Sequence, residues 1–191
     1  MSIKTNYPTI SPSLSLDFAN TRQLDPRITF TRASTATFYD TSTTALAEQN
    51  LFLQSQTFGT TWVTTNGTLT TGITDPLGGT TATTLTATSA AATVYQTLTL
   101  TATPYTLSLY IQRVLGTGAV NLTMDGTTLT PQTITGSWAR YNITVTPTTG
   151  AKTIGIQLAA ITDSVNIWGA QLENRSAVTA YNVTTTAAIT N

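Results

Sequence analysis

Along most of the chain, aliphatic residues alternate one by one with polar residues, and this period of two constrains the fold more than any other feature. Leu107, Leu109 and Ile111, for example, are separated by Ser108 and Tyr110. Successive side chains of a β-strand point to opposite faces, so the alternation predicts strands with one buried and one exposed face. Threonine, the most frequent residue, is β-branched, which disfavours helix and suits a pleated sheet. The sequence therefore predicts an all-β protein.

The alternating runs are short, and glycine, proline, aspartate or asparagine separates them. Strands are expected at 57–65, 82–88, 94–100, 106–112, 120–124, 140–145, 154–158 and 165–168. No long helical pattern occurs in the sequence. About eight short antiparallel strands are typical of a jelly-roll β-sandwich, which we predict for residues 50–191.

The first 49 residues differ in composition from the rest of the chain. Charged residues make up only 8% of the sequence, eight acidic and eight basic, yet half of them fall within the first 48 positions. We predict that residues 1–49 form an extended N-terminal arm with one or two short strands, such as 27–31. Asp25, Arg27 and Arg32 lie at its centre. We interpret them as docking residues, because paired charges fix the register of a contact more than they add affinity.

The charge balance bears on the partners of the protein. The formal net charge is zero, so little would be gained by releasing counterions from a nucleic acid, and no nucleic acid partner is expected. A net charge of zero also weakens self-repulsion and favours a homo-oligomer, with a neutral monomer as the alternative. No apolar stretch follows Met1 or approaches the length that spans a bilayer, so we expect a soluble product made in the cytoplasm, without a membrane partner.

Several kinds of chemistry lack their usual residues. The chain has no histidine and no cysteine, so we predict no catalytic residue, no cofactor and no metal ligand. A carboxylate pair for glycoside hydrolysis is the alternative, but Asp75, Asp125 and Asp163 each stand where a turn-forming aspartate is expected. Asp163 with Asn166 is too small a ligand set to indicate calcium.

The three tryptophans are the candidates for a binding surface. Trp62, Trp138 and Trp168 could serve as an aromatic platform for a carbohydrate, or they could pack at an interface. By alternation, Trp168 lies on the face opposite Val165 and Ile167, so one of these two faces points away from the main core. Packing under the arm or against a neighbouring subunit is the more usual role for such a tryptophan.

Four segments carry a resemblance to a known group of proteins. Residues 16–40, LDFANTRQLDPRITFTRASTATFYD, resemble a motif near the start of many bacteriophage virion proteins of the tail and decoration type. Residues 50–62, NLFLQSQTFGTTW, are similar to the phrase that follows it there. Residues 167–173, IWGAQLE, and 178–181, VTAY, resemble the last core strand of the same modules and the segment after it.

The resemblance implies a non-enzymatic virion structural protein whose second part is similar to the jelly rolls of carbohydrate-binding modules. Compared with many relatives, the link at residues 41–49 is short and the module stands alone, which favours a small component present in many copies. We therefore expect a capsid decoration or cement protein in the virion, a homotrimer docked through its arm on the major capsid protein or another virion protein. The alternative is a tail-tip or tail-fibre adhesin that binds host surface glycans.

Deleting residues 1–48 tests the docking role of the arm. If the arm anchors the protein, the remaining domain should no longer attach to virions in a sedimentation assay. Unimpaired attachment would contradict the anchoring hypothesis.

Overall fold

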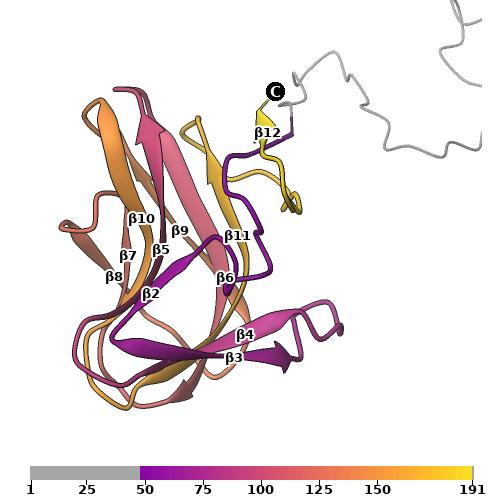
Figure 1. Cartoon of the computed structure of the whole chain (residues 1–191), viewed down its shortest axis with the longest axis vertical. Coiled ribbons are helices and arrows are strands. Elements are labelled where there is room, and N and C mark those ends of the chain that lie inside the picture. The colour runs from indigo at the N-terminus through magenta and orange to yellow at the C-terminus, as the bar shows by residue number, and fades with distance from the viewer. Residues whose placement is uncertain (1–47, 191) are drawn as a thin grey trace, which may run out of the picture. The chain divides into compact units, whose positions relative to one another are not determined.

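Two antiparallel sheets make up the domain described by the computed structural model, which covers residues 48–190 (Figure 1). Sheet A consists, in spatial order, of β2 (Val63–Thr65), β5 (Ala92–Leu100), β10 (Gly150–Leu158), β7 (Val120–Thr123) and β8 (Leu129–Gln132). Sheet B consists of β3 (Gly67–Ile73), β4 (Ala82–Ala87), β11 (Ser164–Glu173), β6 (Tyr105–Leu115) and β9 (Ala139–Val145). A short pair, β1 (Gln49–Asn50) with β12 (Ile189–Thr190), joins the two ends of the described segment. The predicted all-β, jelly-roll-like sandwich is confirmed.

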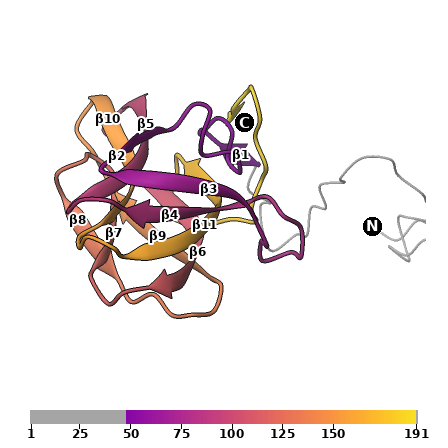
Figure 2. The ribbon, with the colours of Figure 1, turned by 60° about the horizontal axis from the view of Figure 1, so that its bottom comes forward.

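The aliphatic members of the alternating runs fill the space between the sheets. Val165 and Ile167 of β11 face Leu85 of β4 and its neighbours on one side, and Ile156 of β10 and Leu122 of β7 line the other, all of them at most 2% exposed. Figure 2 shows β3, β4, β11 and β6 side by side across sheet B. The other face of each sheet points outward, so the domain has two outer faces on opposite sides of one core.

All eight predicted strands correspond to observed ones, although one is shorter than predicted, and two strands of the sandwich were missed. The missed strands β3 and β8 both lie at sheet edges, where few apolar residues are needed and the alternation is therefore weak. β8 even contains Pro131, which an edge strand tolerates because one side of it has no hydrogen-bonded neighbour. The run predicted at 57–65 is a strand only from Val63, since the residues before it form turns. The predicted arm up to residue 47, with Asp25, Arg27 and Arg32, lies outside the described residues.

A fully buried amide, that of Asn50, connects three segments that are far apart in the sequence. Its Nδ2 donates to the carbonyl of Ala170 on β11 at 3.0 Å and to that of Asn182 near the C-terminus at 2.8 Å. Its Oδ1 accepts from the backbone N–H groups of Phe52 and Leu172, both at 3.2 Å. The entry segment, β11 and the C-terminal segment 174–190 are thus held by one side chain.

A second set of contacts closes the same region. The hydroxyls of Ser55 and Tyr181 are 2.7 Å apart, and Ser55 Oγ also accepts from the N–H of Thr184 at 2.9 Å. Burial raises the pKa of Tyr181 to about 12, so its hydroxyl stays protonated. Ser55 and Tyr181 belong to the segments 50–62 and 178–181 that carry the virion-protein resemblance, and their contacts here stabilise the fold.

Replacing Asn50 with alanine should lower the free energy of unfolding by about 3 kcal/mol, because the change leaves several buried backbone groups without partners. Chemical denaturation measures the effect. Asn142→Ala is the matched control, because Asn142 is exposed on β9 and should change stability by less than about 0.5 kcal/mol. Equal stability of the two variants would contradict the closing role of Asn50.

Candidate functional site

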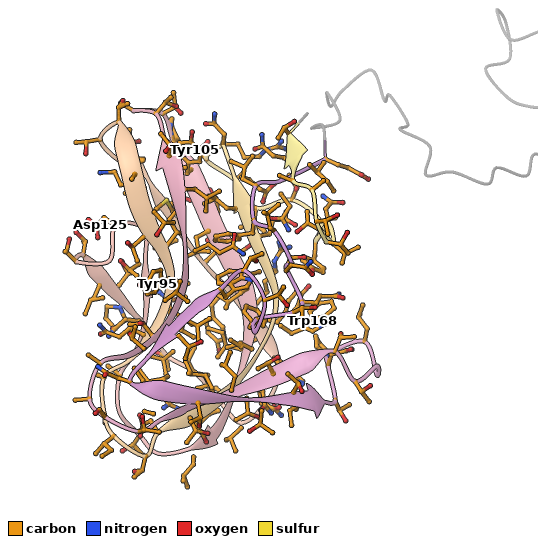
Figure 3. All side chains as sticks on the ribbon, viewed as in Figure 1. Tyr95, Tyr105, Asp125 and Trp168 are labelled. Carbon is orange, nitrogen blue, oxygen red and sulfur yellow. The ribbon has the colours of Figure 1, made fainter. Side chains whose placement is uncertain are left out.

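A tyrosine on the outer face of sheet A stands beside a position without a side chain. In the strand register, Tyr95 of β5 pairs with Val63 of β2 on one side and with Gly155 of β10 on the other. Thr123 of β7 follows Gly155 in the same row. Tyr95 is half-buried, and Val63 is 47% exposed. Figure 3 shows Tyr95 and Asp125 on one side of the domain and Trp168 on the other.

Glycine is required at position 155 by the closeness of its neighbours. A Cβ there would lie 2.0 Å from the carbonyl oxygen of Val94 and 2.8 Å from the Cα of Tyr95. No side chain fits at those distances, so bare backbone lies next to the tyrosine. Gly155 is buried, so β5 and β10 approach each other closely here, and the neighbour of Tyr95 on β10 is backbone without a side chain.

The next row of the same face carries amides. Gln157 on β10 pairs with Thr93 of β5 and with Asn121 of β7, and Asn121 Nδ2 lies 3.4 Å from Gln157 Oε1. Asn121 and Thr123 point outward from the sheet, yet they are only 6% and 4% exposed. Thr123, together with neighbouring side chains of this face, lines a hollow.

This hollow is a groove of about 320 Å³, and we call it the Tyr95 groove. It is formed by sheet A and the β7–β8 turn, and its lining residues are Thr93, Tyr95, Thr123, Asp125, Gly126, Thr127, Thr153, Ile156 and Gln157. The groove therefore combines one aromatic ring with amide and hydroxyl groups, the composition of many small-molecule sites.

Asp125 closes one end of the groove and organises the β7–β8 turn. Its Oδ1 accepts from the N–H groups of Thr127 at 2.8 Å and Thr128 at 2.6 Å, and its Oδ2 accepts from the Thr128 hydroxyl at 2.7 Å. Burial on its own would raise the pKa of Asp125, but these hydrogen bonds outweigh burial and hold that pKa below its ordinary value. The carboxylate is ionised and already engaged by its own turn.

Two of the three predicted tryptophan platforms are buried inside the domain. Trp62 is 8% exposed and its ring centroid lies 4.8 Å from that of Phe52 and 4.9 Å from that of Phe58. Its Nε1 donates to the carbonyl of Gln54 at 3.1 Å. Trp62 therefore has no ring face free for a ligand.

Trp168 is 2% exposed and lies between Tyr110 and Tyr181, with centroid distances of 5.3 and 4.8 Å. Its Nε1 donates to the Thr81 hydroxyl at 2.7 Å. The sequence suggested a cover from the arm or from a neighbouring subunit, whereas the observed cover is the chain's own C-terminal segment. Trp138, by contrast, is only half-buried and lines a separate hollow on sheet B.

The buried carboxylates of the described residues have structural partners. Asp163 lies 3.2 Å from the guanidinium of Arg113, and Glu173 accepts from the N–H of Thr179 at 3.2 Å. The carboxylate of Asp75 accepts hydrogen bonds from backbone N–H groups and a hydroxyl of its own loop. Residues 48–190 contain no group of three or more acidic, histidine or cysteine side chains that could hold a metal ion. They also contain no helix long and apolar enough to cross a membrane.

The sequence alone indicates that Tyr95 faces outward, but it does not identify the residues that surround its ring. Alternation around Val94 places the Tyr95 side chain outward, as for any residue of that phase. Its partners in the groove are contributed by other strands and by the β7–β8 turn, and the pairing register that brings them to Tyr95 cannot be read from the periodicity.

No protein-family model and no curated protein matches the chain. Among solved structures, the CBM22-1 xylan-binding domain of Paenibacillus barcinonensis Xyn10C matches with a TM-score of 0.56 at 13% identity, covering 71% of this chain and 100% of that one. The CBM22-1–GH10 modules of Clostridium thermocellum Xyn10B, solved with xylohexaose, match with a TM-score of 0.51 at 13% identity, covering 68% of this chain and 29% of that one. The fold is that of carbohydrate-binding-module jelly rolls.

The phage resemblance has weaker structural support. Tailspike protein 4 of bacteriophage CBA120 matches with a TM-score of 0.46 at 16% identity, and the match covers 64% of this chain and 21% of that one. A score this low carries no argument about origin. The virion setting therefore still depends on the sequence motif.

Two aspartates should make the stability of the domain fall in acid. The pKa values of Asp75 and Asp125 lie below the ordinary 3.8 in the folded protein, so the unfolded chain takes up their protons at higher pH than the folded domain does. We expect constant stability between pH 8 and pH 5 from these groups, followed by a loss as the pH falls below 3.8.

Urea denaturation midpoints measured across this range test the prediction, and Asp125→Asn should show a smaller loss in acid than the wild type. A pH curve for Asp125→Asn identical to that of the wild type would contradict the role given to Asp125.

Proposed function

We propose that the described domain is a non-enzymatic glycan-binding module and that the Tyr95 groove is its binding site. The observation that carries the proposal is the half-buried ring of Tyr95 in the lining of a groove of about 320 Å³, together with amide and hydroxyl groups, on an outer sheet face. An aromatic ring in the wall of a groove can accept the apolar face of a sugar ring by stacking.

The polar groups around the ring suit hydroxyl ligands. Gln157 lines the groove and offers amide N–H donors and a carbonyl acceptor, and a sugar hydroxyl can pair with either. Its contact with Asn121, at 3.4 Å, is weak and can be exchanged for a stronger bond to a ligand. Gln157 stands in the row of side chains next to Tyr95.

The charge of the groove favours a neutral glycan. Asp125 is the only charged residue that lines it, and the turn's own donors already occupy that carboxylate. An anionic sugar would need a cation that the lining does not supply, and a cationic one would need a free carboxylate. Neutral, hydroxyl-rich chains are therefore the substrate class that fits.

Of the two functions considered from the sequence, this proposal corresponds to the glycan-binding adhesin rather than to the capsid decoration protein. The carbohydrate-binding-module fold and the groove support glycan binding, whereas none of the described residues favours a decoration role over adhesion. We retain the virion location, the homo-oligomer and the docking of the arm through Asp25, Arg27 and Arg32 as proposals from the motif resemblance.

Replacing Tyr95 with alanine should weaken binding at least about tenfold, because truncation of a central aromatic contact commonly costs more than 1.4 kcal/mol. The wild type is first applied to an array of neutral glycans, including xylohexaose, and the best ligand is then titrated by calorimetry. Tyr95→Phe is the matched control, and it should retain binding because the ring remains.

Two results would contradict the proposal. One is a wild type that binds no neutral glycan of the array. The other is glycan binding that Tyr95→Ala leaves unchanged.

A further inference from the structure

We propose a second, independent glycan-binding groove on the outer face of sheet B, so that one domain can hold two neutral glycan chains on opposite sides. This groove, which we call the Trp138 groove, is open and has a volume of about 700 Å³. Its lining residues are Gly72, Ile73, Thr74, Asp75, Pro76, Gly78, Gln112, Trp138 and Asn166. It shares no residue with the Tyr95 groove.

Trp138 supplies the aromatic surface. It directly precedes β9 in the same phase as Arg140, whose side chain lies over the outward-facing ring of Tyr110 at 5.6 Å. Trp138 is half-buried and does not belong to the core between the sheets. Its indole N–H has no hydrogen-bond partner within residues 48–190, unlike those of Trp62 and Trp168. Of the three tryptophans, it alone combines partial exposure with a donor available to a ligand.

A row of hydrogen bonds fixes the amides beside Trp138. The Thr84 hydroxyl donates to Asn166 Oδ1 at 2.5 Å, and Asn166 Nδ2 donates to Gln112 Oε1 at 2.9 Å. Gln112 Nε2 in turn donates to the carbonyl of Gly136 at 2.9 Å. Each amide nitrogen carries two hydrogens, so each keeps a second N–H beyond the one used in this row. The amides are thus oriented before a ligand arrives, which lowers the entropic cost of binding.

The charge of this groove also favours a neutral ligand. Asp75 is the only charged residue in the lining, and it is 6% exposed. Its carboxylate accepts from the N–H groups of Leu77, Gly79 and Thr81 at 2.9 to 3.2 Å, and from the Thr81 hydroxyl at 2.8 Å. Asp75 therefore shapes the loop that forms one wall of the groove and offers no free charge to a ligand.

The C-terminal segment limits where a ligand can lie on sheet B. Tyr181 covers Trp168, and Arg140 Nη1 donates to the carbonyl of Thr179 at 2.6 Å, so this part of the face is occupied by the chain itself. The row at Asn166 and Gln112 stays open between the 74–80 loop and Trp138. An indole, fixed amides and no free charge match the neutral sugar chemistry of the Tyr95 groove, and they supply no charged partner for a protein surface.

The test is affinity electrophoresis in native gels cast with soluble xylan, β-glucan, galactan or galactomannan. The wild type should be retarded by at least one polymer, Tyr95→Ala and Trp138→Ala should each be retarded less, and the double variant should migrate as in a gel without polymer. Calorimetry with an oligosaccharide of the same polymer should give two sites in the wild type and one in each single variant. Trp138→Phe is the matched control and should keep two sites.

The outcomes separate the two grooves. A single site in the wild type that Trp138→Ala leaves unchanged overturns the Trp138 groove and leaves the Tyr95 groove standing. If Trp138→Ala abolishes binding and Tyr95→Ala leaves it unchanged, the Trp138 groove is supported and the function proposed for the Tyr95 groove is contradicted. No retardation in any gel contradicts both. Binding retained at the Tyr95 groove also shows that Trp138→Ala is folded.

Discussion

The buried polar side of β11 is the constraint on which the arrangement of the domain depends. β11 is the central strand of sheet B, and all of its residues are buried, including Gln171 and Glu173, which face outward from the core. Buried polar groups are costly unless they are paired, so this face needs a cover that brings donors and acceptors. The C-terminal segment provides it: the N–H of Asn182 donates to Gln171 Oε1 at 2.7 Å, and the hydroxyl of Thr179 donates to Glu173 Oε1 at 2.5 Å. Asn50 then fixes that cover to the entry segment.

This cover also decides which surfaces remain for ligands. Among the described residues of sheet B, the part around Trp138 stays open, bounded by the loop that Asp75 holds in place. Sheet A has no such cover among the described residues, and its outer face is hollowed into the Tyr95 groove beside the β7–β8 turn. Both open regions combine an aromatic ring with amides and carry no free charge in their lining. These two surfaces are the basis for proposing a neutral glycan on each side of one sandwich.

Periodicity was enough to predict the sandwich because the alternation of aliphatic and polar residues is itself the condition for a half-buried strand. It missed β3 and β8, since edge strands bury little and tolerate residues such as Pro131. It could not locate the Tyr95 groove, because Tyr95 of β5 and Gln157 of β10 come together only through the register of these two strands. It also could not show that Trp168 is covered by the chain's own C-terminal segment, a tertiary contact with no local pattern.

The central claim is that the outer face of sheet A binds a neutral glycan through Tyr95, and chemical-shift mapping tests it most directly. Isotope-labelled protein is titrated with the neutral oligosaccharide that binds best. The account predicts saturable shifts in the backbone amides of β5, β10 and β7 around Tyr95, Gly155 and Thr123. These shifts should saturate before those around Trp138 or together with them. Saturable shifts confined to other regions of the domain, with the amides around Tyr95 unmoved, would contradict it.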